Sequence, residues 1–240
     1  MTRVAVVAAM AGELKPLVQG WQHESRNGVD LWRWRHDEGE WVAACAGAGV
    51  AAATRAIAEI EKDGAVSFFI STGWAGALRA EFKPGRVYNV SGVIDARTGE
   101  RYRVAAGTEG RWLVTSPAVA GEAEKRRLAS TYNADLVDME AAGVARLAGM
   151  RGVPLYCIKG ISDGFTDKLP DFNRFLSPNG QFRLAKFVLF ALLRPWHWSA
   201  LARMNENSRM ASQCIAVSLL DFLDERGYIR KRNGYPNLKR

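Results

Sequence analysis

Residues 66–76 read VSFFISTGWAG, an unbroken apolar run that ends in a glycine-rich segment. Two further apolar runs, RVAVVAA at Arg3–Ala9 and PLYCIKGI at Pro154–Ile161, have the same character. Runs of this length are typical of strands that are buried on both faces of a sheet. Alanine-rich helices are predicted at Gly47–Lys62 and Glu140–Met150. Strands that alternate with helices predict an α/β fold with a mostly parallel sheet covered on both faces.

The rest of the chain continues this alternation without an internal repeat or a low-complexity linker. Asp37–Gly39 predicts a hairpin turn between two strands. Asp167–Gly180 is a polar loop, and too little chain follows it to form a second core. We therefore predict one domain over residues 1–240, with a helical C-terminal extension from about 181 to 240. The other predicted elements are a helix from about Gly12, strands at Leu31–His36, Trp41–Ala46, Arg86–Val93, Arg101–Ala105, Arg111–Ser116 and Ala134–Asp138, a helix at Gly121–Ser130, and two helices after residue 181 that Pro195 separates.

Composition restricts the class of protein. The 240 residues (26.5 kDa) are 48% hydrophobic and 24% charged, which excludes a disordered or collagen-like chain. Cys45, Cys157 and Cys214 are too few and too widely spaced for a disulfide framework or a zinc site, and they fit a reducing cytoplasm. No signal peptide or membrane-spanning segment is predicted. The three histidines are scattered along the chain, so we expect no metal and no cofactor.

Candidate catalytic residues follow the predicted buried strands at equivalent positions. Glu13 comes shortly after the first strand, Gly73–Gly76 after the strand at 66–72, Met139 and Glu140 after the strand at 134–138, and Ser162 and Asp163 after the strand at 154–161. In an open parallel sheet the ligand binds beyond the carboxyl ends of the strands, so three carboxylates are predicted to face one crevice. Each also has an ordinary explanation, because Asp163 fits a turn, Glu140 a helix start and Glu13 a solvated helix face.

At these residues the chain resembles the nucleoside phosphorylase/nucleosidase superfamily, and most closely its adenine-releasing branch, which includes 5′-methylthioadenosine/S-adenosylhomocysteine nucleosidase. The resemblance spans about residues 3–166, and five motifs occur in the family's order. They are VAVVAAMAGELKPL, AGAGVAAA, ISTGWAGAL followed by KPGRVYNV, DLVDMEAAGVARLA and VPLYCIKGISDG. The resemblance implies a phosphorylase/hydrolase-like fold with a central mixed sheet flanked by helices, and a homodimer.

The resemblance also implies a reaction, the cleavage of the N-glycosidic bond of a purine nucleoside, with a 5′-substituted adenosine as substrate and adenine as product. Asp163 is then the general acid that protonates purine N7, and Glu13 deprotonates or positions the nucleophile. Glu140 binds the sugar hydroxyls, and Met139 packs under the ribose. The backbone near Val119 reads the adenine edge. The transition state of such a cleavage resembles an oxocarbenium ion, which a carboxylate stabilises.

Two residues depart from the family's pattern. Trp74 stands in the Gly-x-Ala-Gly loop where the family commonly has serine, and Lys159 stands where it commonly has arginine. Together with Gly73 and Ser162 they are predicted to border the substrate. An indole and an ammonium do not reproduce a hydroxyl and a guanidinium. The nucleophile is therefore left open between water and phosphate, and a catalytically weakened nucleoside-binding protein is the alternative.

The tail carries a second prediction. From about residue 167 the layout resembles the hopanoid-associated phosphorylase branch, which implies as another alternative a phosphorylase that acts on an adenosine-linked hopanoid lipid at the membrane surface. The formal charge of +8 favours acidic partners, and the stretch FRLAKFVLFALLRPWHW at 182–198 is basic and contains two tryptophans. Peripheral contact of the C-terminal helices with the inner membrane surface is one prediction, and packing on the sheet or in a dimer interface is the other. No nucleic-acid motif is present, so nucleic acid is not an expected partner.

Overall fold

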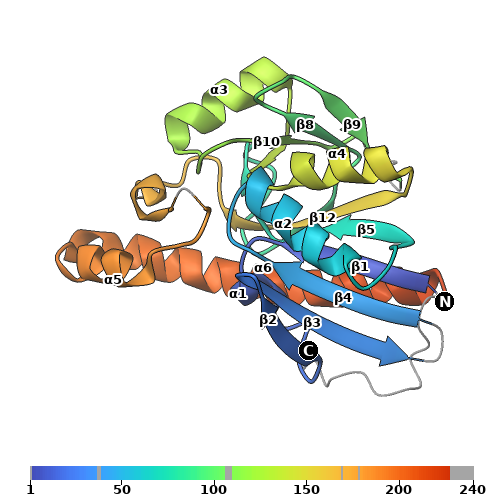
Figure 1. Cartoon of the computed structure of the whole chain (residues 1–240). Helices are drawn as coiled ribbons and strands as arrows, with labels where there is room; N and C mark the ends of the chain where they lie inside the picture. The colour runs from blue at the N-terminus through green and yellow to red at the C-terminus, as the bar shows by residue number, and fades with distance from the viewer. Residues whose placement is uncertain (1, 37–38, 106–109, 169, 178, 228–240) are drawn as a thin grey trace.

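The computed structural model describes residues 2–36, 39–105, 110–168, 170–177 and 179–227. They form an α/β fold around one mixed sheet of twelve strands, in which eleven follow the order β2-β3-β4-β1-β5-β12-β6-β11-β10-β8-β9 and β7 pairs with β12 (Figure 1). The strands are β1 (Thr2–Ala8), β2 (Gln22–Arg26), β3 (Val29–His36), β4 (Gly39–Cys45), β5 (Phe68–Ser71), β6 (Trp74–Ala77), β7 (Val87–Asn89), β8 (Gly92–Asp95), β9 (Arg101–Arg103), β10 (Trp112–Thr115), β11 (Leu136–Asp138) and β12 (Leu155–Asp163).

The sheet contains both strand directions, as the prediction of a central mixed sheet requires. The three apolar runs that open the sequence analysis form its middle, where β1 pairs in parallel with β4 and β5, and β5 pairs in parallel with β12. Antiparallel pairs join β6 to β11 and β3 to β4. The carboxyl ends of β1, β5 and β12 therefore meet at one edge of the sheet, and the candidate site lies at this edge.

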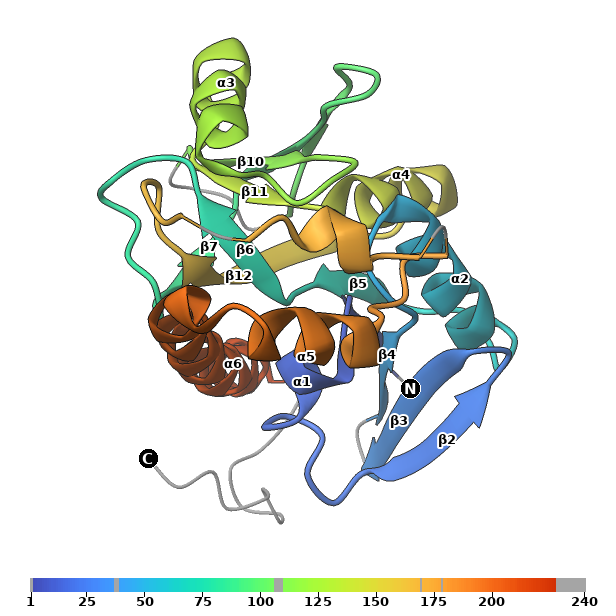
Figure 2. The same ribbon diagram turned by 90° about the vertical axis from the view of Figure 1, so that its left-hand side faces the viewer.

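Helices cover both faces of the sheet, as Figure 2 shows from the side. One apolar core lies between the sheet and α2 and α4, and a second lies between the sheet and α1 and α6. A smaller cluster joins α3 to β8, β10 and β11. The helices are α1 (Ala11–Leu14), α2 (Val50–Glu61), α3 (Glu122–Tyr132), α4 (Ala141–Arg151), α5 (Leu184–Leu192) and α6 (Trp198–Glu225), and short 3₁₀ turns η1 (Phe172–Phe175) and η2 (Pro195–His197) flank α5.

Helix α6 is divided into two halves by its surroundings. Its buried residues begin at Ser208 and continue to Leu223 at helical spacing, so its second half packs on the sheet. Its first half, together with α5, extends beyond the sheet and away from the body of the molecule (Figure 1). The predicted C-terminal extension is thus partly a layer of the core and partly a projecting arm.

Several predicted elements differ in detail from the structure. The segment after β5 was expected to be a loop, but Trp74–Ala77 forms strand β6 between β12 and β11. The strand expected at 86–93 is divided into β7 and β8, which pair with different partners. The polar loop at 167–180 contains η1, whose Phe172 and Phe175 are buried among aromatic rings. Strand β2 was not predicted, and residues 37 and 38 of the expected hairpin turn lie outside the described residues.

Candidate active site

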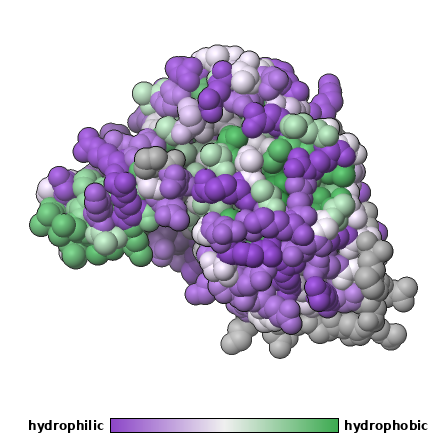
Figure 3. Space-filling model, viewed as in Figure 1, coloured by the Kyte–Doolittle hydropathy of each residue, from purple (hydrophilic) through white to green (hydrophobic). Residues whose placement is uncertain are grey.

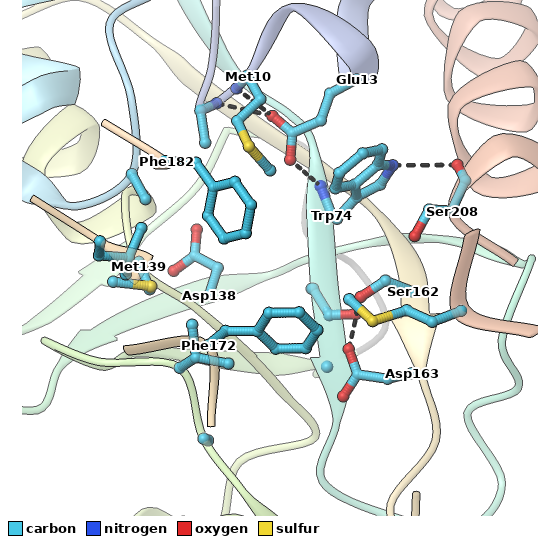
Figure 4. Close-up of a pocket in the computed structure, with 18 of the residues that line it drawn as sticks. Met10, Glu13, Trp74, Asp138, Met139, Ser162, Asp163, Phe172, Phe182 and Ser208 are labelled. Carbon is cyan, nitrogen blue, oxygen red and sulfur yellow. Dashed lines mark hydrogen bonds between the residues drawn. The ribbon is translucent and has the colours of Figure 1, made fainter. Parts of the chain in front are cut away.

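A cavity of about 660 Å³ lies where the ends of β1, β6, β11 and β12 meet α5 and α6 (Figure 4). It brings together most of the side chains predicted for the site, namely Glu13, Trp74, Val119, Met139, Glu140, Ser162 and Asp163. Gly73 and Lys159 are not among the residues that line it. The three carboxylates that follow separate strands therefore do converge on one space.

Glu13 is buried and fixed by backbone amides. Its Oε2 accepts hydrogen bonds from the N–H groups of Ala9 (2.7 Å) and Met10 (2.9 Å), and its Oε1 accepts one from Trp74 N (2.8 Å). Burial raises the pKa of Glu13 above its usual range, while the three amide donors and the charge of Lys159 oppose that rise. Glu13 therefore has one carboxylate position left for a ligand.

Gly73 is required for this arrangement. Its φ of +107° is rarely adopted by other residues, and a Cβ at this position would lie 2.9 Å from the carboxyl atoms of Glu13. Gly73 therefore contacts the carboxyl group of Glu13 and does not line the cavity. Its contribution is to let the backbone of Trp74 approach the Glu13 carboxylate.

Trp74 connects the site to the C-terminal helix. Its indole Nε1 donates to the carbonyl of Ser208 (3.1 Å) and the hydroxyl of Ser212 (2.9 Å), both on α6. The ring itself lies against Gly12 and lines the cavity. The bulky residue that departs from the family pattern is thus a satisfied, fixed part of the wall (Figure 4).

Asp163 is held in a buried ion pair that sequence reasoning did not predict. Its Oδ2 contacts the ammonium of Lys125 from α3, and its Oδ1 accepts a hydrogen bond from Ser162 Oγ (2.5 Å). Lys125 also donates to the carbonyl of Gly164 (2.5 Å). A Cβ at Gly76 would lie 3.0 Å from Asp163 Oδ2 and 3.2 Å from Lys125 Cε, so only glycine leaves this pair enough room.

Lys159 does not reach the cavity, although it is predicted to help hold the nucleophile. It is completely buried, and its ammonium pairs with Asp138 Oδ2 (2.9 Å) and donates to the Thr72 carbonyl (2.7 Å). Burial lowers the pKa of Lys159, but the adjacent Asp138 carboxylate outweighs it, so the net shift is upward. Asp138 Oδ1 also accepts from Thr115 Oγ1 (2.7 Å), which fixes the carboxylate within the sheet.

Glu140 is the N-cap residue of α4, one position before the first turn where it was predicted. Its Oε1 accepts a hydrogen bond from Gly49 N (2.7 Å). Burial, followed by repulsion from Asp138 and Glu13, raises the pKa of Glu140 to about 8, so the carboxyl is mostly protonated at neutral pH in the unliganded protein.

The backbone of Val119 has both polar groups occupied. Its N–H donates to Asn173 Oδ1 (2.8 Å), and its carbonyl accepts from Asn173 Nδ2 (3.1 Å). A carboxamide presents one acceptor beside one donor, which is the pattern of the N1 and N6 edge of adenine. Asn173 on η1 therefore occupies the groups that the resemblance assigns to adenine.

The remaining wall of the cavity is apolar and comes from the C-terminal part of the chain. Phe172 and Leu176 follow the loop after β12, and Phe182, Leu184 and Phe187 belong to the arm around α5. Leu201, Ala202 and Met204 add the first half of α6. The lining therefore combines carboxylates with aromatic and aliphatic side chains, and Figure 4 shows Phe172 and Phe182 beside the labelled acidic residues.

The described residues contain no cluster of three or more His, Cys, Asp or Glu side chains that could hold a metal ion. In the same part of the chain, no helix has both the length and the apolar character that crossing a membrane would require.

Comparison with known proteins identifies the family. The sequence model described as "Phosphorylase superfamily" matches residues 3–120 and 105–189, which together cover most of the chain. The chain belongs to the phosphorylase superfamily. The prediction of an enzyme of the nucleosidase or nucleoside phosphorylase class is thereby confirmed at the level of this superfamily. A search of curated proteins finds no match to the sequence.

Solved structures of nucleosidases and of a futalosine hydrolase share the fold. Helicobacter pylori 5′-methylthioadenosine/S-adenosylhomocysteine nucleosidase, with butyl-thio-DADMe-Immucillin-A, is 16% identical, with a TM-score of 0.70 over 94% of this chain and 99% of that chain. Futalosine hydrolase of Helicobacter pylori is 16% identical (TM-score 0.69; 93% and 98%), and Arabidopsis thaliana 5′-methylthioadenosine nucleosidase is 17% identical (TM-score 0.69; 95% and 98%). At these identities the likeness establishes the fold. The resemblance of the tail to the hopanoid-associated branch finds no support in these comparisons.

The sequence analysis did not identify two charged groups of this cavity, or the aromatic side chains of its wall. Asp138 lies directly before Met139 and Glu140, so its position as the last residue of a buried strand was a usable signal. Lys125 lies in the polar helix α3, and nothing in its local sequence distinguishes it from the exposed basic residues beside it. Phe172 lies within the segment 167–180 that was predicted to be a polar loop, and Phe182 lies just after it.

Proposed function

We propose that this phosphorylase-superfamily protein cleaves the N-glycosidic bond of a purine nucleoside, with a 5′-substituted adenosine as the substrate class. One observation carries the proposal: Glu13, Glu140 and Asp163, from three separate strand ends, line a single cavity together with Met139. The substrates named for the similar solved nucleosidases are 5′-methylthioadenosine and S-adenosylhomocysteine, which are adenosines with a 5′ substituent.

Asp163 is proposed to transfer a proton to the departing purine. In the unliganded site it accepts hydrogen bonds from both Ser162 and Lys125, so its own proton must be supplied. The Lys125 ammonium is the acidic group in direct contact. A proton that moves from Lys125 Nζ to Asp163 and on to purine N7 leaves a neutral amine and a neutral leaving base. Water returns the proton to Lys125 after the products leave.

Glu140 and Met139 are proposed to hold the ribose. A carboxylate beside the sugar stabilises the positive charge that develops as the glycosidic bond breaks. Because the pKa of Glu140 is raised to about 8 in the unliganded site, ionising it at neutral pH has a cost. A cationic sugar within contact distance offsets that cost, so Glu140 releases its proton to water as the transition state forms and stabilises that state as the carboxylate.

Water is the nucleophile that the charges of the cavity favour. The described residues that line it include four carboxylates, Glu13, Asp138, Glu140 and Asp163, but one ammonium, that of Lys125. Lys125 is already paired with Asp163, and Lys159 is paired with Asp138. A phosphate dianion would therefore enter a site in which no described lining residue offers an unpaired cation, whereas a water molecule needs only the remaining position on Glu13. We accordingly propose hydrolysis rather than phosphorolysis.

The apolar part of the cavity lining supports a 5′ substituent that is itself apolar. With the purine assigned to Asp163 and the ribose to Glu140, apolar lining residues such as Phe187, Leu201 and Met204 are left to contact that substituent. Burying a hydrocarbon group against such a wall contributes roughly 25 cal/mol per Å². The proposed substrate is thus an adenosine with a hydrocarbon or thioether group at the 5′ position.

The test is to incubate the full chain with 5′-methylthioadenosine and with adenosine, with and without phosphate, and to measure free adenine. Release of adenine without phosphate supports hydrolysis, and release only with phosphate replaces it by phosphorolysis. The D163N variant should bind the nucleoside but release no adenine. If D163N retains wild-type turnover, the assignment of Asp163 is wrong.

A catalytically weakened nucleoside-binding protein is the second candidate, and the position of Lys159 favours it, because this buried residue is paired with Asp138 and does not line the cavity. Nucleoside binding without adenine release in the same assay would support it. The alternative of a phosphorylase for an adenosine-linked hopanoid is disfavoured by the absence of an unpaired cation among the described lining residues. The homodimer and the cytoplasmic location remain predictions.

A further inference from the structure

The projecting arm, residues 182–204, carries most of the exposed apolar surface of the described chain. The described chain has ten exposed large hydrophobic side chains, and seven of them lie between residues 184 and 198. Such clustering is not the scattered exposure that ordinary surfaces show. The seven side chains are Leu184, Val188, Leu189, Leu192, Leu193, Trp196 and Trp198. Figure 3 shows this apolar surface at the tip of the arm, beyond the polar body of the molecule.

The arrangement of these side chains follows from the two faces of α5. The ring centroids of Phe187 and Phe190 lie 5.5 and 5.1 Å from that of Phe175 on η1. The inner face of the helix therefore packs against η1. The outer face carries the leucines and Val188, and no residue of α5 is buried. A helix that packs through one apolar face and exposes a second apolar face is typical of a binding surface for another molecule.

The charges of the arm identify the kind of molecule. Between residues 182 and 204 the chain has four basic residues, Arg183, Lys186, Arg194 and Arg203, and no Asp or Glu. Three of them are exposed, while the guanidinium of Arg194 lies 4.2 Å from the Phe190 ring centroid. A partner with an apolar layer beneath a negatively charged surface is complementary to this pattern.

The two tryptophans give a third indication. Trp196 and Trp198 are 69% and 53% exposed at the turn between α5 and α6. The indole Nε1 of Trp198 donates to the Ala191 carbonyl (2.7 Å), so this ring is fixed against the end of α5. Tryptophan side chains at the edge of a bare amphipathic helix favour the boundary between lipid headgroups and acyl chains.

We propose that the outer face of the arm docks on an anionic lipid bilayer. The leucines and tryptophans would enter the headgroup and upper acyl region, and the basic residues would contact the anionic headgroups. This proposal goes beyond the proposed reaction and does not depend on it. The arm also walls the cavity through Leu184 and Phe187, so docking brings one wall of the site close to the bilayer surface.

The test is sedimentation of the full chain with vesicles of phosphatidylcholine containing phosphatidylglycerol, and with vesicles of phosphatidylcholine alone. We expect binding to the anionic vesicles and its loss at high salt, because exposed charges are screened. Replacing Leu192 and Leu193 by asparagine should weaken binding about tenfold or more. Replacing Arg183 and Lys186 by glutamine should weaken it about twenty-fivefold, since each basic residue contributes about fivefold.

The matched control is Met150→Asn, which removes a 75% exposed apolar side chain far from the arm, at the end of α4. It should bind vesicles as the wild type does, and the melting temperatures of all variants should be unchanged. Absence of binding to the anionic vesicles at low salt would overturn the proposal. A dimer in analytical ultracentrifugation that the Leu192 and Leu193 substitutions dissociate would also overturn it, because the surface would then be a subunit interface. Adenine release, measured in parallel, tests the reaction separately.

Discussion

Replacing Glu140 by glutamine should make the protein more stable at alkaline pH. Glu140 is buried beside Asp138 and Glu13, and its pKa is raised from 4.5 to about 8. A carboxyl whose pKa is raised on folding stabilises the folded state below its unfolded pKa, and this stability is lost as the pH rises through the folded value. The wild type should therefore lose stability between about pH 4.5 and pH 8. Glutamine keeps an oxygen that can accept from Gly49 N and has no charge to bury.

The magnitude follows from the shift. At 1.36 kcal/mol per pKa unit, an isolated group that moves from 4.5 to about 8 would lose about 5 kcal/mol across this range. Glu140 shares its repulsion with Glu13 and Asp138, so the change is distributed over a set of interacting groups. We therefore expect E140Q to exceed the wild type by about 2–5 kcal/mol at pH 9 and to match it near pH 4.5.

The assay is urea unfolding followed by circular dichroism at several pH values between 4.5 and 9. The matched control is Glu81→Gln, which removes an exposed carboxylate and should leave the pH dependence unchanged. A free-energy difference between E140Q and the wild type that stays constant with pH would refute the reasoning. So would an E140Q protein that is less stable than the wild type at pH 9.

Three further substitutions test other parts of the site. Lys125→Met leaves the Asp163 carboxylate without its buried partner and should lower the free energy of unfolding by about 3–5 kcal/mol; a loss under 1 kcal/mol in urea unfolding would contradict the ion pair. Lys159→Met should lower the free energy of unfolding by a similar amount. A variant as stable as the wild type would show that the carboxylate partner of Lys159 is not charged. Asn173→Ala frees the backbone of Val119 and should tighten nucleoside binding about fivefold in calorimetry, whereas unchanged or weaker binding would mean that Asn173 does not compete with the base.

The sequence was sufficient for the middle of the fold because those strands are decided locally. Each apolar run is long enough to be buried on both faces, and the runs at the beginning, at 66–72 and at 154–161 became β1, β5 and β12. Once parallel strands are adjacent, their ends meet at one edge, so Glu13 and Asp163 reach the same cavity. Strand β11 runs antiparallel to β6, yet its end also reaches this cavity, which the rule for parallel strands does not explain.

The residues that were missed depend on contacts between distant segments. Lys125 is 38 positions from Asp163, and no local pattern distinguishes it from the arginines that follow it on α3. Asn173 meets the Val119 backbone across 54 positions. The 3₁₀ turn that carries Asn173 also contains Phe172 and Phe175, which are buried and whose rings contact Phe187 on α5. Such positions are decided by packing, which a single sequence does not display.

Lys159 and Trp74, the two residues that depart from the family pattern, both affect the same cavity. Lys159 is withdrawn into the sheet, where it neutralises Asp138, so it adds no unpaired cation to the cavity. Trp74 occupies the wall beside Glu13 and fastens that wall to α6 through Ser208. The first departure leaves the cavity without an unpaired cation among its described lining residues, and the second connects the wall beside Glu13 to the helix that begins in the projecting arm. Both features agree with the proposal of water as the nucleophile and of a substrate whose 5′ group extends toward the arm.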